Sequence, residues 1–85
     1  MNIDASRIEK ILRKLKQKDL ALFKAVQRKI NQMALLDHAA INHFKNLRGD
    51  ISEYKRVHIG SFVLIFKVEK DTIIFDRLTH HDEAY

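Results

Sequence analysis

Five residues in the second half of the sequence could together act on a phosphodiester. Arg56 and His58 stand two positions apart, and the last eight residues, LTHHDEAY, contain His80, His81 and Tyr85. Histidine titrates near neutral pH, so one imidazole can take a proton while another gives one. Arginine presents permanently charged donors to phosphate oxygens, and tyrosine can stack on a base. Such a set could cleave RNA by attack of the 2′-hydroxyl on the adjacent phosphate, a route that requires no metal.

Each of these features also has a plainer explanation. A pair of histidines in a polar stretch is usually just exposed, and Arg56 and His58 could mark the solvated face of a sheet. His80, His81 and Asp82 could bind a metal ion, but adjacent residues do not usually converge on one ion. We therefore expect no metal site and no cofactor.

The first part of the sequence predicts a helix over residues 4–18. Its apolar residues recur at three- and four-residue spacing, at Ile8, Ile11, Leu12 and Leu15. Asp4 or Ser6 could cap its start, and Glu9 follows Ser6 by three residues, which is the spacing of a capping box. Lysines and arginines occupy much of the remaining surface of this helix.

A second helix is expected after the break at residues 16–19. Asp19 can cap it, and an apolar stripe continues through Phe23, Val26, Ile30 and Met33. Two helices with so short a connection should form an antiparallel hairpin, here over about residues 4–36, with a basic outer face. Residues 37–50 are weakly periodic, and their two histidines, His38 and His43, are interpreted as surface residues.

The second half predicts an antiparallel meander over about residues 53–79. Three strand-like runs follow one another, at residues 53–59, 62–68 and 72–78. Gly60-Ser61 suits a type II′ turn, and residues 69–71 form the next turn. The middle run is the most apolar in the chain, as expected of a central strand that is buried on both faces.

These elements predict an α+β domain that spans residues 1–85, with the helical hairpin packed on a small antiparallel sheet of three to four strands. The first and third strands of a meander run parallel to each other, so their C-terminal ends lie at the same edge. Arg56 and His58 are therefore expected to share one shallow surface with His80, His81 and Tyr85. A shift of one residue in the register would reverse this facing.

The composition narrows the range of partners. Sixteen Lys and Arg against eleven Asp and Glu give a net charge of +5 in 85 residues. This charge favours a polyanion or an acidic protein as partner, although solubility alone could also explain it. The absence of cysteine suits a cytoplasmic protein. No apolar run approaches the roughly 20 residues that a membrane helix needs, so we expect no membrane association.

The order of these elements resembles the RelE/ParE toxin superfamily. The family pattern has Leu-x-Gly, a basic strand that ends in Gly-x-aromatic, an apolar strand, a turn, a third strand and a short tail with tyrosine. The residues that fill this pattern are Leu47, Gly49, Arg56, Val57, Ile59, Gly60, Phe62 and Tyr85. With the helical hairpin included, the resemblance covers nearly the whole chain.

The resemblance implies the toxin of a type II toxin–antitoxin pair. Members of the ribonuclease branch enter the ribosomal A site and cut mRNA by metal-independent attack of the 2′-hydroxyl. A cognate antitoxin holds them inactive, and a heterotetramer of the two proteins is one possible assembly.

The resemblance also assigns roles to single residues. Arg56 takes the position of a phosphate contact or transition-state stabiliser, and His58 takes the second basic position of the strand. His81 corresponds to a catalytic Arg or His of the tail, and Tyr85 to the stacking tyrosine. The further RNA or phosphate contacts that we expect are Lys45, Arg48, Lys55 and His80.

The sequence departs from the family pattern at several places. Val63 stands where many ribonuclease members carry an arginine, and His58 replaces a permanent cation. Only Met1 to Ile3 could form the first strand of the family, so that edge strand could be absent. Two alternatives therefore stay open: a ParE-like inhibitor that binds DNA gyrase without catalysis, and an inactive homologue that only binds an antitoxin.

Overall fold

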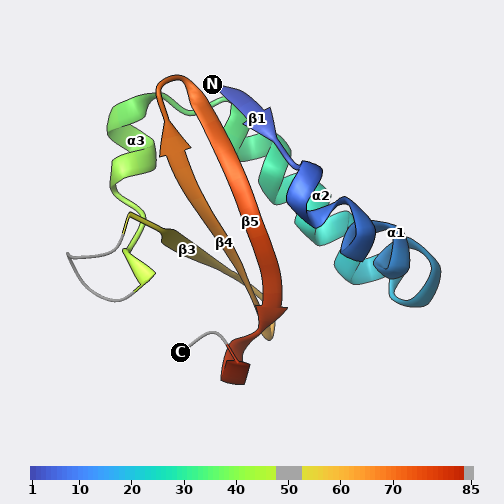
Figure 1. Cartoon of the computed structure of the whole chain (residues 1–85). Coiled ribbons are helices and arrows are strands. Elements are labelled where there is room, and N and C mark those ends of the chain that lie inside the picture. Colours follow the sequence, from blue (N-terminus) through green and yellow to red (C-terminus); the bar gives the residue numbers. More distant parts are fainter. Residues whose placement is uncertain (48–52, 84–85) are drawn as a thin grey trace.

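The structure is a computed structural model that describes residues 1–47 and 53–83. Arg48, Gly49 and Tyr85, which belong to the predicted site or to the family pattern, lie outside the described residues. The elements, in chain order, are β1 (Asn2–Asp4), the 3-10 turn η1 (Ser6–Ile8), α1 (Glu9–Lys18), α2 (Leu20–Ala34), α3 (His38–Asn42), β3 (Lys55–Ile59), β4 (Phe62–Glu69), β5 (Thr72–His80) and the 3-10 turn η2 (His81–Glu83). Figure 1 shows the long strands β4 and β5 side by side, and the helices α1 and α2 together on one side of these strands.

The helical hairpin forms largely as its periodicity predicts. Asp19 ends α1 and caps α2, since its carboxylate accepts a hydrogen bond of 3.1 Å from the backbone N–H of Leu22. The predicted capping box of Ser6 and Glu9 is wrong, because α1 begins only at Glu9 and no side chain caps its start. The carboxylate of Asp4 instead accepts hydrogen bonds from the N–H and the hydroxyl of Ser6, the first residue of η1, at 3.0 and 2.6 Å.

The sheet has four strands in the order β1-β5-β4-β3. The three strands of the meander pair antiparallel as predicted, and Gly60 in the first turn has φ +60°, a value that glycine adopts without strain. The edge strand whose presence was open does form: β1 pairs parallel with β5, and Asn2 is opposite Thr72. The sheet is therefore mixed, because β1 is parallel to β5 whereas the other two pairs of strands are antiparallel.

The central strand β4 is buried on both faces, as its apolar run predicts. Leu64 and Phe66 pack against the helices in the larger core, whereas Val63 and Ile65 face the opposite side of the sheet with Leu47. All four residues from Val63 to Phe66 are fully buried. The helices thus cover one face of the sheet, and this confirms the predicted α+β fold class.

The short helix α3 begins at Asp37, whose carboxylate accepts a hydrogen bond of 2.9 Å from the N–H of Ala40. Further along, residues 45–47 lie beside the outer edge of β3. The N–H of Leu47 donates to the carbonyl of Tyr54, and the N–H of Arg56 donates to the carbonyl of Lys45. These contacts hold residues 45–47 against the strand that carries two of the predicted catalytic residues. Within the described ranges, no helix is both long and apolar enough to cross a membrane.

Candidate functional site

Arg56 and His58 lie on the face of the sheet that the helices leave uncovered. Their direct partners on β4 are Ile65 and Val63, and directly opposed residues of antiparallel strands share a face. Val57, between them, turns to the other side and packs on the helical core. We call this uncovered surface the open face, and define it by Arg56, His58, Val63, Ile65, Arg77, Thr79 and His81.

The open face brings His58 and His81 together, with ring centroids 5.7 Å apart. The N–H of His81 donates a hydrogen bond of 2.8 Å to the carbonyl of Ser61 in the β3–β4 turn. This bond ties the end of β5 to that turn and brings the ring of His81 to the ring of His58. Asp82 lies 3.2 Å from Nδ1 of His81 and orients its imidazole.

A shallow depression of about 310 Å³ lies along the outer edge of β3, next to this histidine pair. Lys45, Arg56 and His58 line it, together with His43, which was predicted only to be a surface residue. The guanidinium of Arg56 donates a hydrogen bond to the backbone carbonyl of Asn46, which fixes the side chain beside the depression. Three of the predicted site residues therefore meet at one hollow.

Two other predicted RNA-binding residues, His80 and Lys55, do not lie on the open face. His80 precedes His81 and faces the opposite side of the strand, where its ring packs edge-on against Phe62 with centroids 5.5 Å apart. The ammonium of Lys55 donates to the carbonyl of Phe44 at 3.2 Å and to the side chain of Asn46 at 2.9 Å. Both residues lie on the helix side of their strands, so they do not join Arg56 and His58 on the open face.

The open face also holds Arg77, which was not among the predicted site residues. The register changes between two neighbouring pairs of β4 and β5: Ile65 is opposite Arg77, but Phe66 is opposite Phe75. This leaves Asp76 as an extra residue, a β-bulge that reverses the phase of the alternation. Simple alternation would put Arg77 on the same side as the buried Phe75, whereas the bulge brings it to the open face.

Val63 shows why the family's arginine is missing at this position. Its side chain is fully buried in a small apolar cluster with Leu47 and Ile65, so it forms part of the floor of the open face. A charged side chain at this position would lose its hydration without gaining a partner. Arg77, one strand over and opposite Ile65, puts a permanent cation on the same face.

The other end of the open face is closed by Tyr54 and Lys67. The ammonium of Lys67 lies 5.5 Å from the centre of the Tyr54 ring and 2.9 Å from Glu69. The hydrogen bond to Glu69 raises the pKa of Lys67 above its usual value, against the opposing effect of burial. This lysine is thus occupied by carboxylates, which leaves the arginine and histidine end as the place for an anionic ligand.

Arg7 approaches the open face from η1. Its guanidinium lies 3.0 Å from the carboxylate of Asp76, which is also 3.9 Å from Arg77. The hydrogen bond to Asp76 and a second one to Tyr54 raise the pKa of Arg7 above its usual value.

In the part of the chain that the structure describes, no three His, Asp or Glu side chains are grouped to hold a metal ion.

The helical hairpin on one face of the sheet and the basic, imidazole-bearing opposite face define a RelE-like toxin fold. The chain is similar to a protein of Methanocaldococcus jannaschii that is named as a toxin, RelE4, with 41% identity over 81 residues, 92% of this chain and 82% of that protein. It is also 31% identical over 84 residues to an uncharacterized protein of Methanosarcina mazei, which covers 94% of this chain and 87% of the relative. No family model and no solved structure matches the chain.

The chain therefore belongs to the RelE toxin family.

Proposed function

We propose that this toxin is a ribosome-dependent mRNA endonuclease that acts by metal-independent attack of the 2′-hydroxyl. The observation that carries the proposal is the pair of His58 and His81, 5.7 Å apart on the face that also holds Arg56. Two imidazoles beside a permanent cation are the groups that this reaction needs, and they adjoin a hollow at the surface.

In the proposed reaction, one imidazole of the pair removes the proton of the 2′-hydroxyl. The resulting oxygen attacks phosphorus, the bond from phosphorus to the 5′-oxygen breaks, and the other imidazole donates a proton to that leaving oxygen. The products are a 2′,3′-cyclic phosphate and a 5′-hydroxyl. Arg56 and Arg77 stabilise the negative charge that grows on the non-bridging oxygens.

The remaining predicted residues have supporting roles in this proposal. Lys45 is exposed at the rim of the depression, where it suits the phosphate of a flanking nucleotide. Tyr85 retains the base-stacking role, and Arg48 the phosphate contact, that the family resemblance implies. The basic outer surface of α1 suits the ribosomal RNA around the A site. The antitoxin holds the toxin inactive in the cytoplasm, in a complex that could be a heterotetramer.

A gyrase inhibitor of the ParE type, or an inactive homologue, would explain the loss of the arginine at Val63. Arg77 weakens that argument, because it restores a cation to the same face. A binding protein would also have no need for two histidines from different elements to meet beside an arginine.

The decisive experiment is incubation of the purified protein with ribosomes that carry a defined mRNA, followed by primer extension. We expect cut ends at codon positions with the wild type and far fewer with His81→Ala or Arg56→Ala. An RNA with sulfur in place of the leaving 5′-oxygen needs no protonation there, so it should restore cleavage by the variant that lacks the general acid. Intact mRNA, together with broken DNA in cells that express the toxin, would instead support the gyrase inhibitor.

A further inference from the structure

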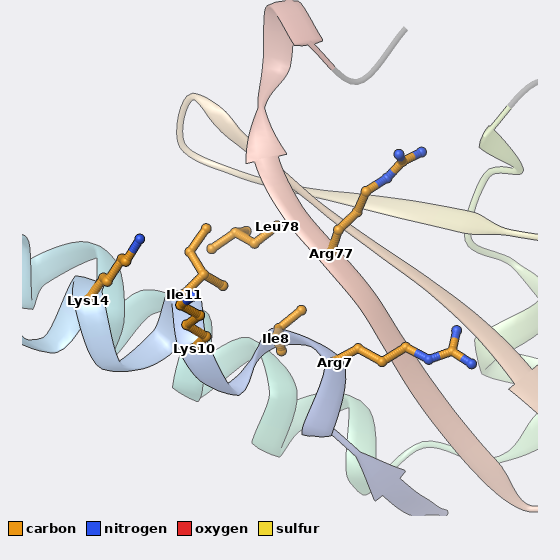
Figure 2. A pocket seen from close by; sticks show the side chains of 7 residues that line it. All are labelled: Arg7, Ile8, Lys10, Ile11, Lys14, Arg77 and Leu78. Carbon is orange, nitrogen blue, oxygen red and sulfur yellow. The ribbon is translucent and has the colours of Figure 1, made fainter.

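The β-bulge in β5 places the carboxylate of Asp76 between two arginines. Its Oδ1 lies 3.0 Å from a terminal nitrogen of Arg7, and its Oδ2 lies 3.9 Å from Nε of Arg77. Figure 2 shows the guanidinium groups of Arg7 and Arg77 on the same side of β5, opposite to Leu78. One carboxylate thus bridges two cations that come from opposite ends of the sequence, and it uses a different oxygen for each.

The two contacts of this bridge are unequal. Arg7 donates a hydrogen bond to Asp76, whose side chain is only 26% exposed, and this bond is the largest cause of the raised pKa of Arg7. The contact with Arg77 is longer and more exposed. By itself, a carboxylate next to Arg77 would compete with a phosphate for the charge of that arginine. Because Arg7 offsets the negative charge, Asp76 can hold Nε of Arg77 while the terminal nitrogens of Arg77 bind another anion.

Arg77 also stands directly across the sheet from Arg56. Both residues are opposite Ile65 of β4, so two strand spacings, about 10 Å, separate their backbones. An exposed arginine samples many rotamers, and a ligand that binds it must fix one of them at a cost in conformational entropy. A contact that holds Arg77 before the ligand arrives removes part of this cost.

We propose that Asp76 is a positioning residue of the RNA site, which holds Arg77 toward the scissile phosphate while Arg7 offsets the charge of the carboxylate. Asp76 itself does not contact the RNA. The effect on cleavage rests on the proposed nuclease function, whereas the effect on the mobility of Arg77 does not. One consequence is unusual: loss of Arg7 alone should be more harmful than loss of Arg7 and the carboxylate together, because the carboxylate would then pair with Arg77.

The first test is single-turnover cleavage of ribosome-bound mRNA, measured over a range of concentrations of the full-length protein. Asp76→Asn should lower the rate at saturation about tenfold, as expected for lost orientation, with little change in the half-saturating concentration, and Asp76→Glu should retain most of the rate. Arg7→Ala should lower the rate about 10²-fold, as the loss of a transition-state donor does. The double variant Arg7→Ala/Asp76→Asn should recover to the rate of Asp76→Asn.

Matched controls are Arg28→Ala on α2 and Asp71→Asn in the β4–β5 turn, which change the net charge equally and lie away from the open face. A double variant that is as slow as Arg7→Ala or slower would overturn the proposal, because it would show that the two residues only support the fold. A rate of Asp76→Asn equal to that of Asp71→Asn would overturn it as well.

The second test needs no activity. ¹⁵N NMR relaxation of the arginine Nε–H groups in the free protein should show that Arg77 is more ordered than the exposed Arg28, and that Asp76→Asn removes this difference. If Arg77 is equally mobile in the wild type and in Asp76→Asn, Asp76 does not position it. If the order of Arg77 falls in Asp76→Asn but the wild type cuts no mRNA, the positioning of Arg77 stands and the proposed nuclease function fails.

Discussion

The rings of His58 and His81 lie 5.7 Å apart although β4 separates the two strands that lead to them. The approach depends on the hydrogen bond from the N–H of His81 to Ser61, because this bond holds the end of β5 against the β3–β4 turn. The separation of the two imidazoles is therefore set by the pairing of the sheet. A separation of this size allows both rings to reach one phosphodiester from different sides.

If the two histidines are the acid and the base of one reaction, loss of either should lower the rate of cleavage by about 10²–10⁴-fold. His58→Ala and His81→Ala would be compared in single-turnover cleavage of ribosome-bound mRNA. The double variant should cleave only slightly more slowly than the less active single variant, because groups that act as a unit have non-additive effects on the rate. His38→Ala is the control, since His38 lies on α3 and contacts Asp71 rather than the open face. Independent, multiplying effects of the two substitutions would argue against a shared reaction.

We expect Arg77 to contribute to the cleavage rate as a hydrogen-bond donor to the transition state. Arg77→Ala is expected to lower the cleavage rate by about 10²-fold, the usual cost of one such donor, with Arg77→Lys retaining part of the activity. Arg28→Ala provides the control, because Arg28 is an exposed arginine on α2, away from the open face. Equal cleavage rates for Arg77→Ala and Arg28→Ala would show that Arg77 has no part in the reaction.

Because Val63 is buried, we predict that the arginine of the family pattern is unfavourable at this position. Restoration of the family's arginine, Val63→Arg, should destabilise the protein by about 3 kcal/mol, because an unpaired charge would enter the apolar floor beside Leu47 and Ile65. Urea unfolding measures this loss, and Val63→Ala shows how much of it comes from lost packing alone. If Val63→Arg had normal stability and cut mRNA faster, the apolar cluster of Leu47 and Ile65 would be shown to accommodate a charged side chain.

Much of this arrangement could be predicted from the sequence because periodicity reports directly on burial. The apolar run of β4 and the alternation around Arg56 predicted the meander, and its topology predicted that His58 and His81 meet. Arg77 could not be placed, since a bulge reverses the alternation by one extra residue, Asp76, without any distinct signal in the sequence. The strand β1 could not be predicted either, because three residues are too few to show an alternating pattern. Its pairing with β5 also joins residues that are far apart in the sequence.

The start of the chain offers a prediction with a defined dependence on pH. Hydrogen bonds from the hydroxyl and then the N–H of Ser6 lower the pKa of Asp4 below its usual value. A carboxylate with a lowered pKa stabilises the folded state at pH values above its unfolded pKa of about 3.9, and this contribution is lost as the pH falls through the folded pKa. The wild type should therefore be more stable than Asp4→Asn at pH 6, and the difference should shrink as the pH falls through the folded pKa of Asp4.

Urea unfolding of both proteins across this pH range measures the difference, and NMR titration of the Asp4 carboxyl measures its pKa directly. Ser6→Ala is the informative companion, because it removes the largest cause of the shift and should move the pKa of Asp4 back toward its usual value. Because the carboxylate of Asp4 holds Ser6 at the start of η1, and η1 carries Arg7 to Asp76, Asp4→Asn should also weaken the ion pair that lies beside Arg77. A pKa of Asp4 that stays low in Ser6→Ala would show that another group holds the charge.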